Sequence, residues 1–293
     1  MSNKQRIVTF LICATLLCFS GCVSKKGVDG DGSKGDGDIT IAATSASVMQ
    51  ICAKMDIDLV GIPDTSYEIP DCYKNVAKVG SPMTPDMEIL AQVNPDWVLS
   101  PVTLMADLKP KYEAAGLSYG FLNLKSVNGM YRSIEDIGNL FGKEKEADAL
   151  ISEYIEFYNN YKANTKGKEA PTVLILMGLP GSYVVATPNS YVGNLLELAG
   201  GQNLYDDPVQ EFLNINTEDM LKKDPDIILR TAHALPDEVV EMFKEEFRTN
   251  DIWKHFSAVK NDRVYDLPSE YFNMSATFGY QEALNVLDDI LYE

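Results

Sequence analysis

Few residues in this chain could do chemistry, and an imidazole stands out among them. The 293 residues include only two histidines. His233 follows an apolar, strand-like run and has small neighbours (Thr-Ala-His-Ala), which leave room for a flat ligand. Histidine is the commonest metal-ligating side chain. His255 lies between Lys254 and Phe256 in a helical surface segment, and we interpret it as structural.

No catalytic motif accompanies these histidines. The sequence lacks a Gly-rich phosphate loop, a nucleophile elbow, a Cys-x-x-Cys pair and clustered His and carboxylate residues with metal-ligand spacing. A Ser/His/Asp arrangement built on either histidine stays open, although no sequence feature indicates one. We therefore expect a binding protein rather than an enzyme.

Two segments repeat each other and must position any site. Each has a Glu, six residues, then Pro-Asp and an apolar run: Glu88 to Pro95 in the first copy and Glu218 to Pro225 in the second, 130 residues later. The pattern predicts a short helix, a turn and a buried strand in each half. Because this period is too long for a solenoid, it predicts two similar lobes with a cleft between them.

Alternating strand and helix patterns give the same organisation. Residues 39–142 are expected to form an N-terminal α/β lobe with a largely parallel sheet. Gly142 breaks the helical pattern, and one long linking helix is expected over 143–165. Residues 166–293 form the C-terminal α/β lobe, ending in a helix predicted over Ala276–Leu291. The fold class expected is α/β, with two Rossmann-like lobes joined by one backbone helix.

The N-terminus carries a targeting segment. Lys4 and Arg6 precede a short apolar stretch, and Cys22 follows two small residues. This arrangement resembles a bacterial lipoprotein signal. We expect residues 1–21 to be the signal peptide, Cys22 to carry lipid, and residues 22–38 (Gly, Asp, Ser and Lys-rich) to be a flexible tether. The alternative is an ordinary secretory signal cleaved nearby.

Charge and cysteine content exclude some functions. The formal net charge is −18, from 25 basic and 43 acidic residues, and removing the two basic residues of the signal makes it −20. Such an acidic chain is a poor match for nucleic acid or anionic lipid head groups. Beyond the signal and the lipid site, only Cys52 and Cys72 remain. An exported protein allows a disulfide between them, but we favour two unpaired thiols because spacing alone does not establish bridge geometry.

Three segments in the second half carry a resemblance to a known family. They are Gly-Asn-Leu-Leu-Glu-Leu-Ala-Gly-Gly-Gln-Asn at 193–203, Trp-Lys-His-Phe-Ser-Ala-Val-Lys at 253–260, and Arg-Val-Tyr at 263–265. With the two lobes and the long helix, they resemble the class III substrate-binding proteins of bacterial ABC importers. The resemblance covers residues 39–293. It implies a protein that holds a siderophore, cobalamin or haem between its lobes.

One group within that family is matched more closely. The segments at 80–88 (Gly-Ser-Pro-Met-Thr-Pro-Asp-Met-Glu) and 230–233 (Arg-Thr-Ala-His) resemble haem-binding lipoproteins of Gram-positive surface iron-uptake systems. Those proteins hold haem iron between a Met of the first lobe and a His of the second. The matching residues are Met83 and His233, which we expect in equivalent places of the two lobes, and the implied ligand is heme b (iron protoporphyrin IX). Taken alone, Met83 is one of eleven methionines, most of which fill core gaps.

Haem also brings two propionates, which an acidic protein must neutralise locally. Backbone amides at helix N-termini can do so without basic side chains. The candidate donor loops contain Thr44, Ser45, Thr65 and Ser66. The usual role of such residues is only to cap helices. Four aromatic residues are candidates either for the porphyrin face or for the lobe cores: Tyr183, Tyr205, Tyr271 and Phe272.

The resemblance also implies partners. An acidic residue on each lobe of these proteins docks Arg residues of an ABC permease dimer, and Glu88 and Glu218 match that spacing. The alternative is a helix N-terminal Glu stabilised by the helix dipole. A haem-donor surface protein would load the carrier. We expect a monomer that is lipid-anchored on the extracytoplasmic face of the cell membrane and binds no nucleic acid.

Two other functions compete with haem transport. One is a siderophore- or cobalamin-binding component of an ABC importer. Siderophore sites favour several basic residues, whereas only Arg230 is expected near the cleft. The mature chain has four arginines: Arg132, Arg230, Arg248 and Arg263. The other competing function is a chelatase-like structural or sensor protein with the same fold.

Overall fold

The computed structural model describes residues 39–165, 167–233 and 235–292. They belong to one compact unit, Ile39–Glu293. The expected signal peptide, the lipid site at Cys22 and the tether lie outside the described residues. Within the described ranges, no helix is both long enough and apolar enough to span a bilayer.

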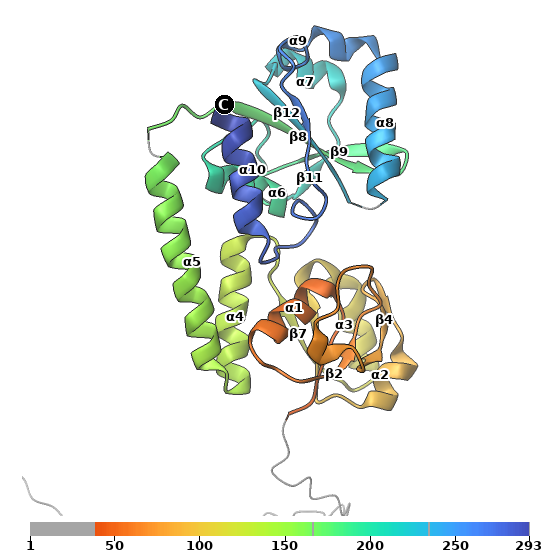
Figure 1. Ribbon diagram of the computed structural model, residues 1–293. Helices are drawn as coiled ribbons and strands as arrows, with labels where there is room; N and C mark the ends of the chain where they lie inside the picture. Colours follow the sequence, from red (N-terminus) through yellow and green to blue (C-terminus); the bar gives the residue numbers. More distant parts are fainter. Residues whose placement is uncertain (1–38, 166, 234, 293) are drawn as a thin grey trace, which may run out of the picture. The chain divides into compact units, whose positions relative to one another are not determined.

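The first half of the unit is built on a parallel sheet with strand order β3-β2-β1-β6-β7 (Figure 1). Every pair of neighbouring strands in it runs parallel, so the strands' carboxyl ends lie at one edge. The strands are β1 (Ile41–Ala43), β2 (Leu59–Ile62), β3 (Ala77–Lys78), β6 (Trp97–Pro101) and β7 (Ser118–Leu122). The remaining elements are α1 (Ala46–Lys54), α2 (Met87–Val93), α3 (Met105–Ala114), two 3-10 turns, η1 (Asp71–Tyr73) and η2 (Val102–Leu104), and a hairpin of β4 (Gly80–Ser81) and β5 (Thr84–Pro85).

The second half is built on a mixed sheet with order β11-β9-β8-β12-β13, in which β10 also pairs with β8. β8, β10, β12 and β13 run parallel, whereas β9 and β11 are antiparallel to their neighbours. A Pro-Gly turn connects β8 to β9, and its Gly181 has a φ of 80°, a value that favours glycine.

The strands of this sheet are β8 (Thr172–Leu179), β9 (Ser182–Ala186), β10 (Gln202–Asn203), β11 (Phe212–Leu213), β12 (Ile227–Ala232) and β13 (Val264–Asp266). Its helices are α6 (Tyr191–Ala199), α7 (Thr217–Lys223), α8 (Pro236–Thr249), η3 (Asp251–His255), α9 (Ser257–Lys260) and α10 (Tyr280–Tyr292).

Two helices connect the sheets. α4 (Val127–Phe141) ends at Gly142, which adopts a left-handed φ of 68°, and α5 (Glu144–Thr165) follows after one further residue. The two helices lie side by side in Figure 1. Tyr131 and Tyr154 stack between them with ring centroids 4.4 Å apart. The break predicted at Gly142 is therefore real.

The repeat corresponds to a shared substructure. Asp86 and Asn216 cap the N-termini of α2 and α7, and Asn94 and Asp224 end these helices in the left-handed region. The following strand then starts beside a Thr of the opening strand of its own sheet. Asp96 Oδ2 accepts from the Thr40 amide (2.9 Å) and hydroxyl (2.8 Å). Asp226 Oδ2 accepts from the Thr172 amide (2.8 Å) and hydroxyl (2.6 Å) in the same way.

One buried cluster passes through both halves. It includes Ile41 of β1, Ile134 of α4, Val173 of β8 and Leu284 of α10. Separate clusters cover the opposite face of each sheet. Each sheet is therefore sandwiched between two apolar layers, and the layer containing the connecting helices is common to both.

Polar contacts also join the halves. The Val127 amide donates to Asn194 Oδ1 (3.0 Å), and the Ala276 amide donates to the Leu124 carbonyl (2.7 Å). Lys125 Nζ lies 2.6 Å from Glu211 Oε1. These bonds fix the entrance to α4 against the second half.

Two sequence expectations need comment. The last helix begins at Tyr280, not at Ala276 as predicted, because the Ala276 amide is bonded to Leu124 instead of continuing a helical ladder. Cys52 is buried, Cys72 is exposed, and both are free thiols. The structure therefore agrees with two unpaired cysteines.

Candidate functional site

Met83 lies at the tip of the β4–β5 hairpin. Gly80 pairs with Pro85 and Ser81 with Thr84, leaving Pro82 and Met83 in the turn. The Met83 side chain is 67% exposed. A thioether left in solvent by a short paired hairpin is not a core gap-filler. It is free to contact a ligand, which a buried methionine would not be.

The hairpin is held beside the end of β2. The Asp64 amide donates to the Gly80 carbonyl (2.8 Å). Gly80 has a φ of 90°, and a Cβ there would lie 2.8 Å from the Asp86 amide nitrogen, so the position requires glycine. This bond places Thr65 and Ser66, which follow Asp64, at the same edge as Met83.

The two candidate donor loops of the first half differ. Thr44 is fully buried, and its hydroxyl donates to the Leu99 carbonyl (3.3 Å) and bonds with Ser100 Oγ (2.7 Å). Ser45 Oγ accepts from the Val48 amide as the N-cap of α1. Both hydroxyls thus serve the fold, so a role for this loop in ligand binding is left to backbone amides.

The 64–67 loop is more open. Thr65 Oγ1 accepts from the Tyr67 amide (3.0 Å), while Ser66 is exposed and the Tyr67 ring is 48% exposed. Lys78 Nζ lies 3.7 Å from Asp64 Oδ1 at the surface. A hydroxyl, an aromatic ring and a cation therefore gather near the hairpin that carries Met83.

His233 directly follows β12. Its amide donates to the carbonyl of Gly178 (3.0 Å), the residue opposite Ala232 in β8. The side chain is exposed, but nearby protein displaces enough water to lower the pKa of the imidazole below its ordinary value of 6.5. The imidazole is therefore neutral at pH 7, which is the metal-binding form.

The segment after His233 is unusual. Leu235 has a φ of 46° and is 53% exposed, although the left-handed region is unfavourable for a branched side chain. Helix α8 then begins with Pro236 and packs closely on β8. A Cβ on Gly178 would lie 2.3 Å from Val239 Cγ1, so the close approach of α8 depends on this glycine.

Met83 and His233 are not in equivalent places, contrary to expectation. Met83 precedes α2 of the first repeat, whereas His233 follows β12 of the second. The difference arises because the hairpin has no counterpart before α7. Both residues nevertheless lie at the carboxyl-end edge of a sheet, where open α/β sheets bind ligands.

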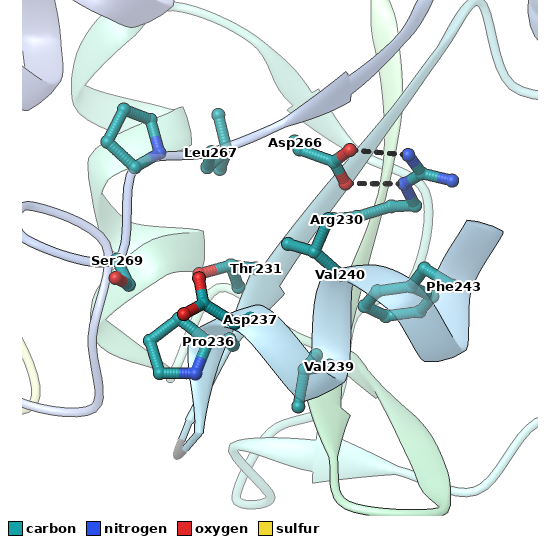
Figure 2. Close-up of a pocket in the computed structure, with 12 residues that line it drawn as sticks. Arg230, Thr231, Pro236, Asp237, Val239, Val240, Phe243, Asp266, Leu267 and Ser269 are labelled. Atoms are coloured by element: carbon teal, nitrogen blue, oxygen red, sulfur yellow. Dashed lines mark hydrogen bonds and ion pairs between the residues drawn. The ribbon is translucent and has the colours of Figure 1, made fainter.

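Arg230 is not a free anion receptor. Its Nε and Nη2 donate to Asp266 Oδ1 and Oδ2 at 2.7 and 2.6 Å, and the side chain is mostly buried (Figure 2). The guanidinium also lies 4.8 Å from the Phe247 ring centroid. This bidentate pair joins β12 to β13, so the arginine that could favour a siderophore is already used.

Three of the four candidate aromatics are enclosed in the second half. Phe272 is fully buried, Tyr205 is buried and donates to Asp219 Oδ2 (2.7 Å), and Tyr183 packs against Phe243. Tyr271 is partly buried against the main cluster. The exposed Tyr67 and Leu235 are better placed for a ligand. Sequence patterns do not single them out because their exposure depends on tertiary packing.

Glu88 and Glu218 are the second residues of α2 and α7, and both are exposed. His255 lies exposed in η3, consistent with its structural interpretation. The two glutamates are thus free to meet a partner surface, while the same positions also suit the helix dipole.

The fold defines a two-lobed substrate-binding protein, and comparison with known proteins agrees. Residues 41–271 match the family model described as periplasmic binding protein, and the chain belongs to this family. Substrate-binding proteins of ABC importers work with permease components outside the cytoplasm, at the membrane, and are not enzymes.

Individual relatives narrow the class. The chain is 36% identical over 296 residues to the high-affinity heme uptake system protein IsdE of Staphylococcus aureus, with 99% of each chain covered. The crystal structure of S. aureus IsdE complexed with heme matches with a TM-score of 0.83 and 38% identity, covering 88% of this chain and 100% of that one.

Other solved structures share the fold. An ABC transporter substrate-binding protein from Listeria monocytogenes matches with a TM-score of 0.84 and 47% identity, covering 87% of this chain and 99% of that one. The vitamin B12 binding protein BtuF of Vibrio cholerae is only 14% identical (TM-score 0.70, covering 86% and 95%), which shows the fold alone.

Proposed function

We propose that this protein is the haem-binding lipoprotein of an ABC importer, which captures haem between its lobes and delivers it to a permease for iron acquisition. The observation that carries the proposal is the exposure of Met83 on a hairpin tip and His233 at a strand end. Full-length similarity to a protein named for heme uptake supports it.

The two side chains suit haem iron. A neutral imidazole is a strong axial ligand, and a thioether is a softer one that raises the reduction potential of the iron. The lowered pKa of His233 favours the ligating form at neutral pH. One ligand from each half would make haem binding depend on how the halves are held together.

The propionates need local neutralisation. The 64–67 loop supports this role because Ser66 is exposed and the loop is bonded to the hairpin that carries Met83. The amides after Ser45 at the start of α1 are the second source of donors.

Delivery rests on the remaining expected residues. Lipid on Cys22 would hold the carrier at the extracytoplasmic face of the cell membrane, and a surface haem-donor protein would load it. Glu88 and Glu218 would dock the permease dimer, one from each half; their equivalent, exposed positions support this role.

The alternative is a siderophore or cobalamin carrier. The same fold serves a vitamin B12 binding protein, so architecture alone does not decide between these ligands. Engagement of Arg230 by Asp266 argues against an anionic siderophore.

Visible absorption with one equivalent of haem tests the proposal. Wild type should give a low-spin Met/His spectrum, and both Met83→Ala and His233→Ala should alter it. Met105→Ala and His255→Ala are matched controls, since both residues are also exposed. Absence of a saturable haem complex would contradict the function. A spectrum unchanged in both ligand variants would contradict the site.

A further inference from the structure

A small pocket adjoins the segment that carries His233. It has a volume of about 190 Å³ and lies between α8, the end of β12 and the residues after β13 (Figure 2). Ala232, the residue before His233, lines it, and so does Pro236, three residues beyond. Apolar cavities of about 150 Å³ accept a benzene-sized group. The pocket is thus large enough for the edge of a flat ligand.

Most of the lining is apolar. Val239, Val240 and Phe243 come from α8, and Leu267 faces them from the segment after β13. The polar groups in the wall are largely engaged within the protein. Arg230 is bonded to Asp266 through two nitrogens, and the Thr231 hydroxyl donates to the Phe272 carbonyl (2.6 Å).

The charge of the lining disfavours an anion. Arg230 and Asp266 cancel, which leaves the exposed carboxylate of Asp237 and a formal charge of −1. The N-terminus of α8 would otherwise attract a carboxylate. Here Asp237 and Glu238 already occupy its first turn, and Pro236 has no amide hydrogen to donate.

Haem has two chemically different edges. One carries two carboxylates and the opposite one carries two apolar vinyl groups. We infer that the pocket beside His233 receives the vinyl edge of haem, so that the propionates point away from α8. This inference rests on the proposed function and adds to it the orientation of the ligand.

Proton NMR of the low-spin haem complex tests the orientation. Valine and leucine methyl labelling gives probes on both walls, at Val240 and Leu267. Nuclear Overhauser contacts from vinyl protons to these methyls would support the inference. Contacts from propionate methylenes, or no haem contacts to either residue, would overturn it. Failure to form any haem complex would instead contradict the proposed function.

A pocket-filling variant gives an independent measurement. Val240→Phe should weaken haem binding on the order of tenfold, because it displaces a vinyl group of two buried carbons. Deuterohaem, which has hydrogens in place of vinyls, should be weakened much less. Glu241→Phe, one residue along α8 and outside the pocket lining, is the control and should affect neither ligand. Equal weakening of both ligands by Val240→Phe would overturn the assignment.

Discussion

The two copies of the repeat match where they build the fold and differ where ligand residues lie. Both have a capped seven-residue helix, a left-handed residue at its end and an aspartate bonded to a threonine of the opening strand. The matches end outside this unit. Leu213, 130 residues after Met83, is a partly buried strand residue, and Thr103, 130 residues before His233, lies in η2.

This difference separates framework from site. Residues common to both copies satisfy backbone groups that any such lobe must satisfy. The hairpin carrying Met83 and the turn carrying His233 each occur once, so they are additions to the shared frame. Four predictions test this separation, in order of expected effect.

Charge reversal at both shared glutamates should have the largest effect on transport. In Glu88→Lys/Glu218→Lys the proposed contacts with permease arginines become repulsive, so haem import in cells should be abolished while the haem spectrum stays that of wild type. Glu153→Lys/Glu156→Lys, on the exposed side of α5, is the matched control. Loss of haem binding in the first variant would argue against docking.

Loss of the unshared residues should have the next largest effect, on affinity. His233→Ala should weaken haem binding at least tenfold, about 1.4 kcal/mol, and Met83→Ala should weaken it less because a thioether is the softer ligand. Thr103→Ala and Leu213→Ala should leave the absorption spectrum unchanged. A titration against pH adds a check. Wild-type affinity should be constant near pH 7 and fall only as the pH drops through the lowered pKa of His233.

The shared aspartates should matter for stability alone. Asp96→Ala and Asp226→Ala each remove two bonds to a threonine, and we expect a loss of about 1 kcal/mol in the free energy of unfolding. The loss should be smaller for Asp226, which is more exposed. Urea unfolding measures it, and haem affinity should not change. A large loss of affinity in either variant would blur the line between framework and site.

Acid adds a second readout for Asp226. Bonds from the Thr172 hydroxyl and amide lower the pKa of this carboxyl below 3.8 in the folded protein. Its stabilisation is therefore present above pH 3.8 and is lost as pH falls through the lowered pKa. The stability difference between wild type and Asp226→Ala should shrink in that range.

The left-handed helix ends should respond with opposite signs. Asn94→Gly should raise the free energy of unfolding by about 0.5 kcal/mol, because glycine adopts a φ of 46° without strain. Asp224→Gly should lower it by about 1 kcal/mol, because Asp224 also accepts from the Ser257 amide and hydroxyl. Thermal unfolding of both variants checks the pair, and equal shifts would contradict this account.

The parts of the fold that depend on local pattern were predictable from sequence. The repeat, the break at Gly142 and the buried strand at β12 follow from spacing and from residues with strong backbone preferences. The antiparallel strand β9 and the late start of α10 were not, because tertiary pairing decides strand direction and the bond from Ala276 to Leu124 replaces a helical one.

The same limit applies to the site. Sequence motifs selected Met83 and His233, but their exposure and unequal placement depend on the hairpin and on the end of β12. Arg230 gave no sequence sign of its partner, since Asp266 becomes adjacent only through the pairing of β12 with β13. Contacts between distant segments are what a linear pattern cannot supply.

The apolar layer common to both sheets has a thermodynamic consequence. Because α4, α5 and α10 bury residues that also cover β1 and β8, opening one lobe would expose core surface of the other. The two lobes should therefore melt together in a single cooperative transition, despite their separate sheets. Amides of α4 and α5 should exchange with solvent only through global unfolding, as slowly as any in the protein.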